Sequence, residues 1–448
     1  MDAYRMTTPD LNVSAPPVAE KLAALLRFPT VAGPGEDEMA VIGGRRAMGE
    51  LYPLVASRCE QHLIAGRGVV FRWRGRESEN PWVLMAHYDV VPAEEQGWEH
   101  APFSGDIAGG YVHGRGALDT KGTLAAMLQA AEELLEEGFT PARDVFFCFS
   151  GDEETFGPTT GETIRWLWEN GHAPDFVLDE GGWMDGSPLP GFQGLAAMVG
   201  VGEKGMAQLR LSVRGRGGHA SRPHGPTQAD ILVAAMERMR KSPWPMRFTD
   251  PVRRTMRALS PLCAYPWRLL YTYPDSFGKL LFRMFDRLSG EHAALLRTTC
   301  ALTQMDGSRA SNVIPDEVRA GYNLRLLPGD TQESVLERAR EVVRDARVHL
   351  EVVLGNDPSP VSETDGPAFG RIKAAVAAVW PQAVTAPALM VGATDAYHYS
   401  LVCPRVYRFS PLRVTPQEAA CVHAANERLP VGALMEAVLF YRALLRGE

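Results

Sequence analysis

The sequence has no feature of a disulfide-rich, zinc-finger or membrane-spanning protein. Its six cysteines are scattered over 448 residues without a Cys-x-x-Cys pair, which implies no disulfide framework and excludes a zinc finger by spacing. It contains no run of about 18 apolar residues, the length needed to cross a bilayer, and Met1–Arg5 carry no apolar signal region. We therefore expect a cytoplasmic protein with reduced thiols and no membrane segment.

The sequence also lacks an excess of positive charge. Its 46 lysines and arginines are outnumbered by 54 aspartates and glutamates, and the net charge of −8 argues against nucleic acid or an anionic membrane as a partner. A local basic stretch at residues 238–257 is interrupted by prolines and an aspartate, so we interpret it as a solvated surface.

Apolar runs alternate with helical patterns and predict an α/β fold in which helices flank a mixed sheet. A strand-like run ends near His87, and a helix with apolar residues at i, i+3, i+4 and i+7 follows and ends at Gly138. The length favours more than one domain. We assign the first domain to two segments of the chain, residues 1–203 and 356–448.

The pattern changes near residue 204, because residues 207–213 alternate apolar and polar side chains as a half-solvated antiparallel strand does. Residues 204–355 are therefore predicted to form an inserted α+β domain. Within it, residues 242–296 are rich in proline and aromatic side chains. This segment could form an apolar pocket or a partner surface, and a locally packed subdomain is the simpler interpretation.

Three acidic clusters stand out in the sequence, each directly after an apolar run or a glycine-containing loop. His87 and Asp89 come directly after an apolar run, and residues i and i+2 of a strand share a face. His87 can therefore bind a metal while Asp89 orients its second ring nitrogen. Asp119 follows a glycine-containing loop, where a carboxylate can bridge two cations.

Glu153 and Glu154 follow a second apolar run, residues 145–149. One glutamate of such a pair can bind a metal while its neighbour stays free as a general base, which is what metal-assisted hydrolysis requires. A lone His-x-Asp or acidic run is usually structural. Three such clusters at the ends of strands, where open α/β sheets collect their ligands, indicate a two-metal hydrolase site.

Further donors for such a site occur later in the chain. Asp179 and Glu180 follow the apolar run 176–178 and supply another carboxylate, and His423 is the leading candidate for a second nitrogen ligand. Mixed nitrogen and oxygen ligands suit zinc, and cobalt or manganese would also fit. His219 follows two glycines, so it could contact a ligand or simply occupy a turn.

These ordered motifs resemble the M20 family of metallopeptidases and aminoacylases over nearly the whole chain. The matching segments are residues 85–92, 97–99, 102–105 and 114–119. Residues 177–182, together with the long aromatic insert, are most similar to the carboxypeptidase S branch. That branch includes secreted N-acyl amino acid hydrolases.

The resemblance implies a role for each candidate residue. It implies two zinc ions held by two histidines, a bridging aspartate and further carboxylates: His87, Asp119, Glu154, His423 and one of Asp179 and Glu180, with Glu180 slightly preferred. Glu153 would then be the general base, and Asp89 would orient His87. The fold implied is a zinc-peptidase-type α/β domain with an inserted domain that serves as lid and dimerisation unit.

The resemblance also implies how the substrate is held. In a homodimer, His219 would reach across the interface into the partner's site and stabilise the oxyanion. Asn312, Arg325 and the loop that contains Gly392 and Thr394 would hold a free carboxylate of the substrate. Arginine can bind such a carboxylate through two hydrogen bonds.

The chain departs from the family pattern at two positions. Ala424 follows His423 where many relatives have glycine, and this difference could shift the backbone of the loop. Thr120 follows Asp119 where the carboxypeptidase S branch usually has an acid. We expect neither difference to abolish activity.

Three functions agree with these residues. The first is a carboxypeptidase or dipeptidase that cleaves small peptides. The second is an aminoacylase that cleaves N-acyl amino acids, whose acyl chain could lie against the aromatic insert. The third is a catalytically silent binding protein on the same fold, which is disfavoured because every catalytic position is chemically intact.

Overall fold

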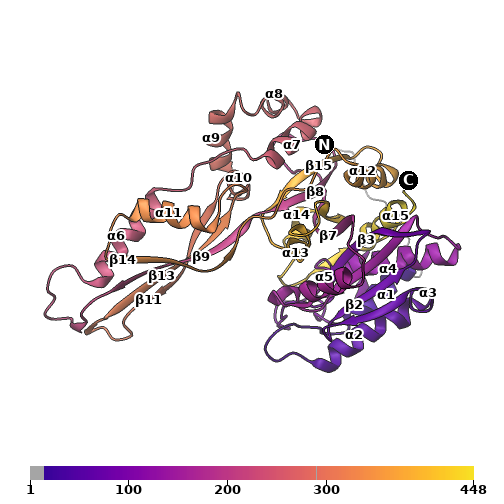
Figure 1. Cartoon of the computed structure of the whole chain (residues 1–448), viewed down its shortest axis with the longest axis horizontal. Helices are drawn as coiled ribbons and strands as arrows, with labels where there is room; N and C mark the ends of the chain where they lie inside the picture. The colour runs from indigo at the N-terminus through magenta and orange to yellow at the C-terminus, as the bar shows by residue number, and fades with distance from the viewer. Residues whose placement is uncertain (1–14, 289, 448) are drawn as a thin grey trace.

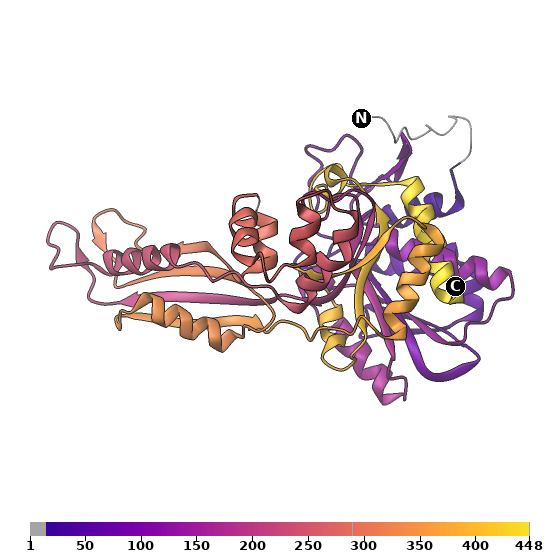
Figure 2. The same ribbon diagram turned by 90° about the horizontal axis from the view of Figure 1, so that it is seen from above.

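The computed structural model describes residues 15–288 and 290–447. A body made from both ends of the chain carries an arm that extends away from it (Figure 1, Figure 2). Residues 1–5, on which the expectation of no signal region rests, lie outside the described part of the chain. Among the described helices, none is long and apolar enough to cross a membrane.

The body is built on a mixed eight-stranded sheet, which confirms the predicted fold class. Its spatial order is β1 (Glu60–Ile64), β2 (Gly68–Trp73), β6 (Arg143–Ser150), β3 (Glu77–His87), β7 (Phe176–Asp185), β16 (Val406–Arg413), β8 (Ala196–Glu203) and β15 (Val384–Met390). Strand β3 runs parallel to both β6 and β7, and His87 lies opposite Ser150. The carboxyl ends of β3 and β6 therefore meet at one edge, where α/β sheets bind ligands.

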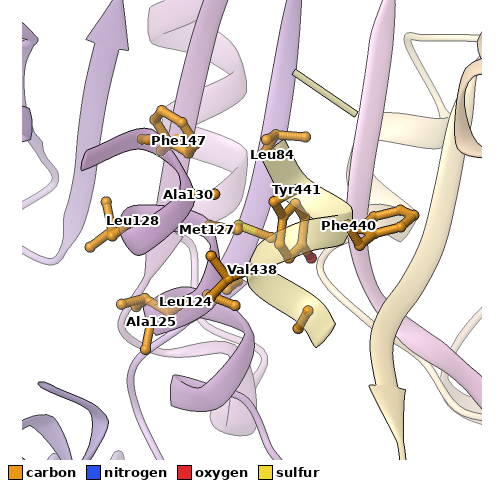
Figure 3. Close-up of a cluster of buried hydrophobic side chains, with 14 of the residues drawn as sticks. Leu84, Leu124, Ala125, Met127, Leu128, Ala130, Phe147, Val438, Phe440 and Tyr441 are labelled. Carbon is orange, nitrogen blue, oxygen red and sulfur yellow. The ribbon is translucent and has the colours of Figure 1, made fainter. Parts of the chain in front are cut away.

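Helices cover both faces of this sheet. One face packs against α1 (Pro17–Leu26), α2 (Glu38–Leu51), α3 (Pro53–Arg58), α4 (Lys121–Glu136), α12 (Pro367–Val379) and α15 (Val431–Arg446). Leu84 and Phe147 point into this layer (Figure 3). Their neighbours Val83 and Phe146 pack on the other face, with α5 (Thr159–Glu169) and α13 (Ala396–Ser400). Strands buried on both faces are apolar at successive positions, which explains the continuous runs in the sequence.

The arm is an antiparallel sheet with helices on one face. Its spatial order is β11 (Thr299–Asp306), β13 (Glu317–Leu326), β9 (Gly205–Arg214) and β14 (Val348–Asn356), and its helices are α6 (Gln228–Lys241) and α11 (Gln332–Val343). Leu209 and Leu211 of β9 face these helices, and Arg210 between them pairs with Glu351 outside this core. The predicted half-solvated antiparallel sheet is thus confirmed.

The aromatic insert forms a small helical unit. It consists of α7 (Asp250–Leu259), α8 (Trp267–Thr272), α9 (Gly278–Leu288) and α10 (Gly290–Leu296). Val252 and Met256 share an apolar core with Leu389 of β15, and the Thr255 hydroxyl donates a hydrogen bond to the Pro387 carbonyl at 2.5 Å. The insert is therefore a packed subdomain, and it lies against edge strand β15 of the body rather than inside the sheet of the arm.

A buried ion pair ties the sheet of the body to the base of the arm. Glu203, the last residue of β8, accepts a hydrogen bond from Arg408 of β16 at 2.6 Å, and neither side chain is exposed. The Thr394 hydroxyl donates to the same carboxylate at 2.7 Å. Strand β9 of the arm begins two residues later, so this pair fixes the point from which the arm departs.

We expect Arg408→Leu to lower the free energy of unfolding by about 3–5 kcal/mol, because it leaves the Glu203 carboxylate buried without its partner. Urea denaturation of the purified variant measures this loss. The control is Arg165→Leu, which breaks the exposed pair of Arg165 with Glu162 and should cost far less. A loss for Arg408→Leu no larger than that of the control would contradict the prediction.

Candidate metal centre

The candidate site lies at the sheet edge defined by β3 and β6. His87 is the last residue of β3. Asp119 lies just before α4, and Glu153 and Glu154 open the short 3-10 helix η1 (Glu153–Thr155) after β6. The helix and strand ends thus bring together residues that are up to 67 positions apart, because β3 and β6 are paired neighbours.

Asp119 lies between two histidines. Its Oδ1 atom is 3.0 Å from Nε2 of His87, and its Oδ2 atom is 2.9 Å from Nε2 of His423. His423 lies in the turn between α14 (Pro416–Ala419) and β17 (Arg428–Pro430). One carboxylate therefore faces two imidazoles, as a ligand bridging two cations would.

Each histidine also faces a second carboxylate. Glu180 Oε1 lies 3.2 Å from Nε2 of His87, and Glu154 Oε1 lies 3.2 Å from Nε2 of His423. Glu153 is farther from His87, at 3.9 Å. The site therefore consists of two halves, one around each histidine, joined by Asp119.

The two residues of the Asp179-Glu180 pair have different surroundings. Strand β7 does not end before this pair, as the apolar run suggested, but continues to Asp185. Adjacent residues of a strand point to opposite faces. The Asp179 carboxylate turns away from the histidines and accepts hydrogen bonds from the Ala396 amide at 2.8 Å and the Glu180 amide at 2.9 Å. The structure thus brings Glu180, and not Asp179, to the other candidate ligands.

The donor set fits a pair of divalent cations. A single Nε2–H can donate to one acceptor, yet Nε2 of His87 faces both Asp119 and Glu180. Ligands placed tetrahedrally about 2.1 Å from a zinc ion are about 3.4 Å from each other, and these donor atoms lie slightly closer, at 2.9–3.2 Å. His87, Asp119 and Glu154 also offer ligand atoms that all lie within 4.8 Å of one another.

The concentration of acids shifts the protonation of the site. Burial, together with the charges of Glu180, Asp395 and Glu154, holds the pKa of Glu153 well above its usual range. Hydrogen bonds to Asp119 and Glu154 raise the pKa of His423 to about 10. Like charges in a buried site repel strongly, so the carboxylates require positive charge beside them.

Asp89 connects the two halves of the site, although not solely through the contact that the sequence suggested. Nδ1 of His87 lies 3.0 Å from the Asp89 carbonyl oxygen and 3.4 Å from its Oδ1 atom. The other carboxylate oxygen accepts a hydrogen bond from the Glu154 amide at 3.0 Å. Asp89 thus holds the orientation of His87 and the backbone of Glu154 at the same time.

Glu427 is a buried residue of the site that sequence reasoning missed. Its carboxylate accepts hydrogen bonds from the amides of Leu118 at 2.8 Å and Asp119 at 3.2 Å, and from Arg115 at 2.7 Å. It follows His423 by four residues and therefore joins the two loops that carry Asp119 and His423. A single acid in a mixed loop gives no periodic signal in the sequence.

The predicted substrate-binding residues lie at two distant places. Arg325 is opposite Met206 in the β13–β9 pair, at the base of the arm. Burial of Lys204 lowers the pKa of this lysine to about 7, and the nearby charge of Arg325 contributes to the shift. Gly392 is exposed, and Thr394 binds Glu203. All three lie near the junction of body and arm.

His219 and Asn312 lie instead at the far end of the arm. Short strand β10 (Gly218–His219) pairs with β12 (Val313–Ile314), and the Ala220 amide donates to the Asn312 carbonyl at 2.9 Å. The ten residues of β9 separate this end from the body, a span of roughly 30 Å. Within one chain the structure therefore does not bring His219 or Asn312 to the candidate metal ligands.

Comparisons with known proteins agree with this geometry. Residues 83–447 match the peptidase family M20/M25/M40. The chain is 33% identical over 437 residues to the N-fatty-acyl-amino acid synthase/hydrolase PM20D1 of Homo sapiens, with 96% of this chain and 87% of that protein covered. It is 31% identical to the probable carboxypeptidase S-like 2 of Dictyostelium discoideum, with 96% and 85% covered.

The fold has a solved counterpart. The M20 family metallo-carboxypeptidase of Sulfolobus solfataricus superimposes with a TM-score of 0.70 at 18% identity, covering 96% of this chain and 98% of that one. Fold and site together define a hydrolase of the metallopeptidase class. The chain belongs to the peptidase family M20/M25/M40, and the resemblance inferred from its motifs is confirmed.

We expect Glu180→Gln to lower the metal content of the purified protein by about one ion per chain, because one ligand carboxylate is lost. Asp179→Asn is the matched control, since it makes the same chemical change one residue away, on the face of β7 that does not meet the histidines. Its metal content should equal that of the unaltered protein in elemental analysis. Loss of metal from Asp179→Asn alone would show that the assignment is reversed.

Proposed function

We propose that this chain is a two-metal amide hydrolase that cleaves next to a free carboxylate, as a carboxypeptidase or dipeptidase. The observation that carries the proposal is the row of donors from Glu180 through His87, Asp119 and His423 to Glu154. This row supplies the ligands of two cations that share one carboxylate. Family membership supports the same chemistry.

Zinc is the metal we propose, two ions per chain, because imidazole and carboxylate ligands suit it; cobalt and manganese accept the same donors. His87, Glu180 and one oxygen of Asp119 would hold the first ion. His423, Glu154 and the other oxygen of Asp119 would hold the second. When bound, such a pair polarises the amide carbonyl and lowers the pKa of the attacking water.

Glu153 is the proposed general base. It lies beside the donor row without facing either histidine closely, being 3.9 Å from His87, and its side chain retains 14% exposure. Burial and the neighbouring carboxylates raise its pKa, and a raised pKa suits a carboxylate that first accepts and then donates a proton. Glu153 would accept a proton from water and pass it to the leaving amine.

The free carboxylate of the substrate is proposed to bind at the base of the arm. Arg325 lies there in β13 and can form two parallel hydrogen bonds with a carboxylate. Gly392 and Thr394 belong to the adjacent loop after β15. Asn312 and His219 would complete the site in a homodimer, in which the partner subunit's His219 supports the developing oxyanion. Their exposed position at the far end of the arm supports this arrangement.

A second candidate function is the hydrolysis of N-acyl amino acids. The observation that favours it is the likeness to human PM20D1, named as an N-fatty-acyl-amino acid synthase/hydrolase, over 96% of this chain. The two functions share one mechanism and one carboxylate site. They differ only in the group on the acyl side of the scissile bond.

We also propose a cytoplasmic location, because of the state of the cysteines. All six cysteines are free, and four of them are buried. Buried thiols without partners are typical of proteins from reducing compartments.

The two candidate functions are separated by incubating zinc-loaded protein with a mixed panel of dipeptides and N-acyl amino acids and identifying products by mass spectrometry. Release of amino acids from peptides alone supports the carboxypeptidase or dipeptidase. Release from N-acyl amino acids alone supports the second candidate. Zinc-loaded protein that cleaves no member of either set would contradict the proposed function.

We expect Glu153→Gln to lower kcat about 10²–10⁴-fold, because the proton acceptor is lost. Elemental analysis should find the metal content unchanged, since Glu153 is not a proposed ligand. Glu162→Gln on the exposed face of α5 is the control for the substitution itself. Near-normal turnover of Glu153→Gln would refute the assignment of the base.

A further inference from the structure

Phe156 combines an unfavourable backbone conformation with an unfavourably exposed aromatic side chain. Its φ is +54° and its ψ is +43°, the left-handed region. Its side chain is 76% exposed. A bulky residue at positive φ is uncommon and strained, and a largely exposed phenyl ring buries little apolar surface to offset that strain.

The turn explains the backbone conformation of Phe156, but it does not explain why the residue is aromatic. The Phe156 amide donates to the Glu153 carbonyl at 2.8 Å and closes η1, the turn that carries both glutamates of the site. Glycine or asparagine would close the same turn with less strain. The turn therefore explains the left-handed residue and leaves the phenyl ring unexplained.

Phe156 lies close to the candidate metal centre along the chain. The side chains of Glu153 and Glu154 are 14% and 9% exposed, and Phe156 follows within three residues. The chain thus passes from the buried donor row to solvent in a single turn. Phe156 thus exposes an apolar surface within one turn of Glu153 and Glu154, where a group bound at the site can cover it.

The order of strands in the sheet indicates which end of a bound substrate lies near Phe156. Strand β6, which leads to Phe156, and strand β8, which leads to the arm and Arg325, lie on opposite sides of β3 and β7. Four strand spacings separate them, about 19 Å. A substrate whose carboxylate binds Arg325 therefore extends its acyl end, and not its carboxylate, toward Phe156.

We infer that Phe156 determines specificity by contacting an apolar group on the acyl side of the scissile amide. The inference rests on the proposed function and refines it, because it adds that the site prefers a large apolar acyl group to a small one. Such a group can be the acyl chain of an N-acyl amino acid or an apolar side chain of a peptide. A contact of this kind contributes about 10-fold or more to kcat/KM.

The test compares kcat/KM for N-dodecanoyl and N-acetyl derivatives of one amino acid, using zinc-loaded full-length protein. Phe156→Asn removes the ring and suits the left-handed backbone, so the ratio of the two values should fall about 10-fold. Phe156→Tyr keeps the ring and should keep the ratio. Tyr265→Ser, which removes another exposed ring from the helical insert (79% exposed), should also keep it.

Two outcomes would overturn the inference. One is an unchanged ratio in Phe156→Asn; if both kcat/KM values fall equally, Phe156 supports Glu153 and does not determine specificity. The other is an equal fall in ratio for Tyr265→Ser. If the unaltered protein cleaves neither these amides nor the dipeptide Leu-Gly, the proposed function fails and the inference fails with it.

Discussion

The repulsion between carboxylates gathered in one buried site is the constraint on which the rest of the structure depends. Asp119, Glu153, Glu154 and Glu180 surround two imidazoles at distances of 2.9–3.9 Å. Several carboxylates gathered around the same two imidazoles in a low dielectric repel one another and oppose folding unless cations lie between them. The fold must therefore hold the ligands rigidly, so that metal binding does not depend on reordering them.

The rigidity comes from a second set of acids that each join two ligand-bearing segments. Asp89 contacts His87 through its carbonyl and the Glu154 amide through its carboxylate. Glu427 binds the amides around Asp119 while belonging to the segment of His423. Asp89 therefore fixes the two halves of the site relative to each other, and Glu427 fixes the His423 segment relative to Asp119. Such outer contacts commonly change metal affinity when they are altered.

The body and the arm contribute different parts of the proposed chemistry. The body holds the whole donor row and the base, whereas Arg325 lies where the arm begins and His219 where it ends. The insert packs on β15 and leaves η1, on the other side of the sheet, open. The strand order thus separates the carboxylate end of a substrate from its acyl end, and a single exposed ring at η1 can act on specificity without touching the metal ligands.

The sequence by itself determined which apolar segments form the central strands, although not every strand end, since β7 continues past its apolar run to Asp185. His87 and Glu153 were predicted because apolar runs of strand length precede them, and that local signal survives folding since both faces of these strands are buried. Only the tertiary structure showed that Glu180, and not Asp179, lies beside His87, because the two side chains point to opposite faces of the sheet. The tertiary structure also determined the contacts of Glu427, the packing of the insert against β15 and the distance of His219 from the candidate metal ligands. These features depend on contacts between residues far apart in the chain, for which the sequence carries no local pattern.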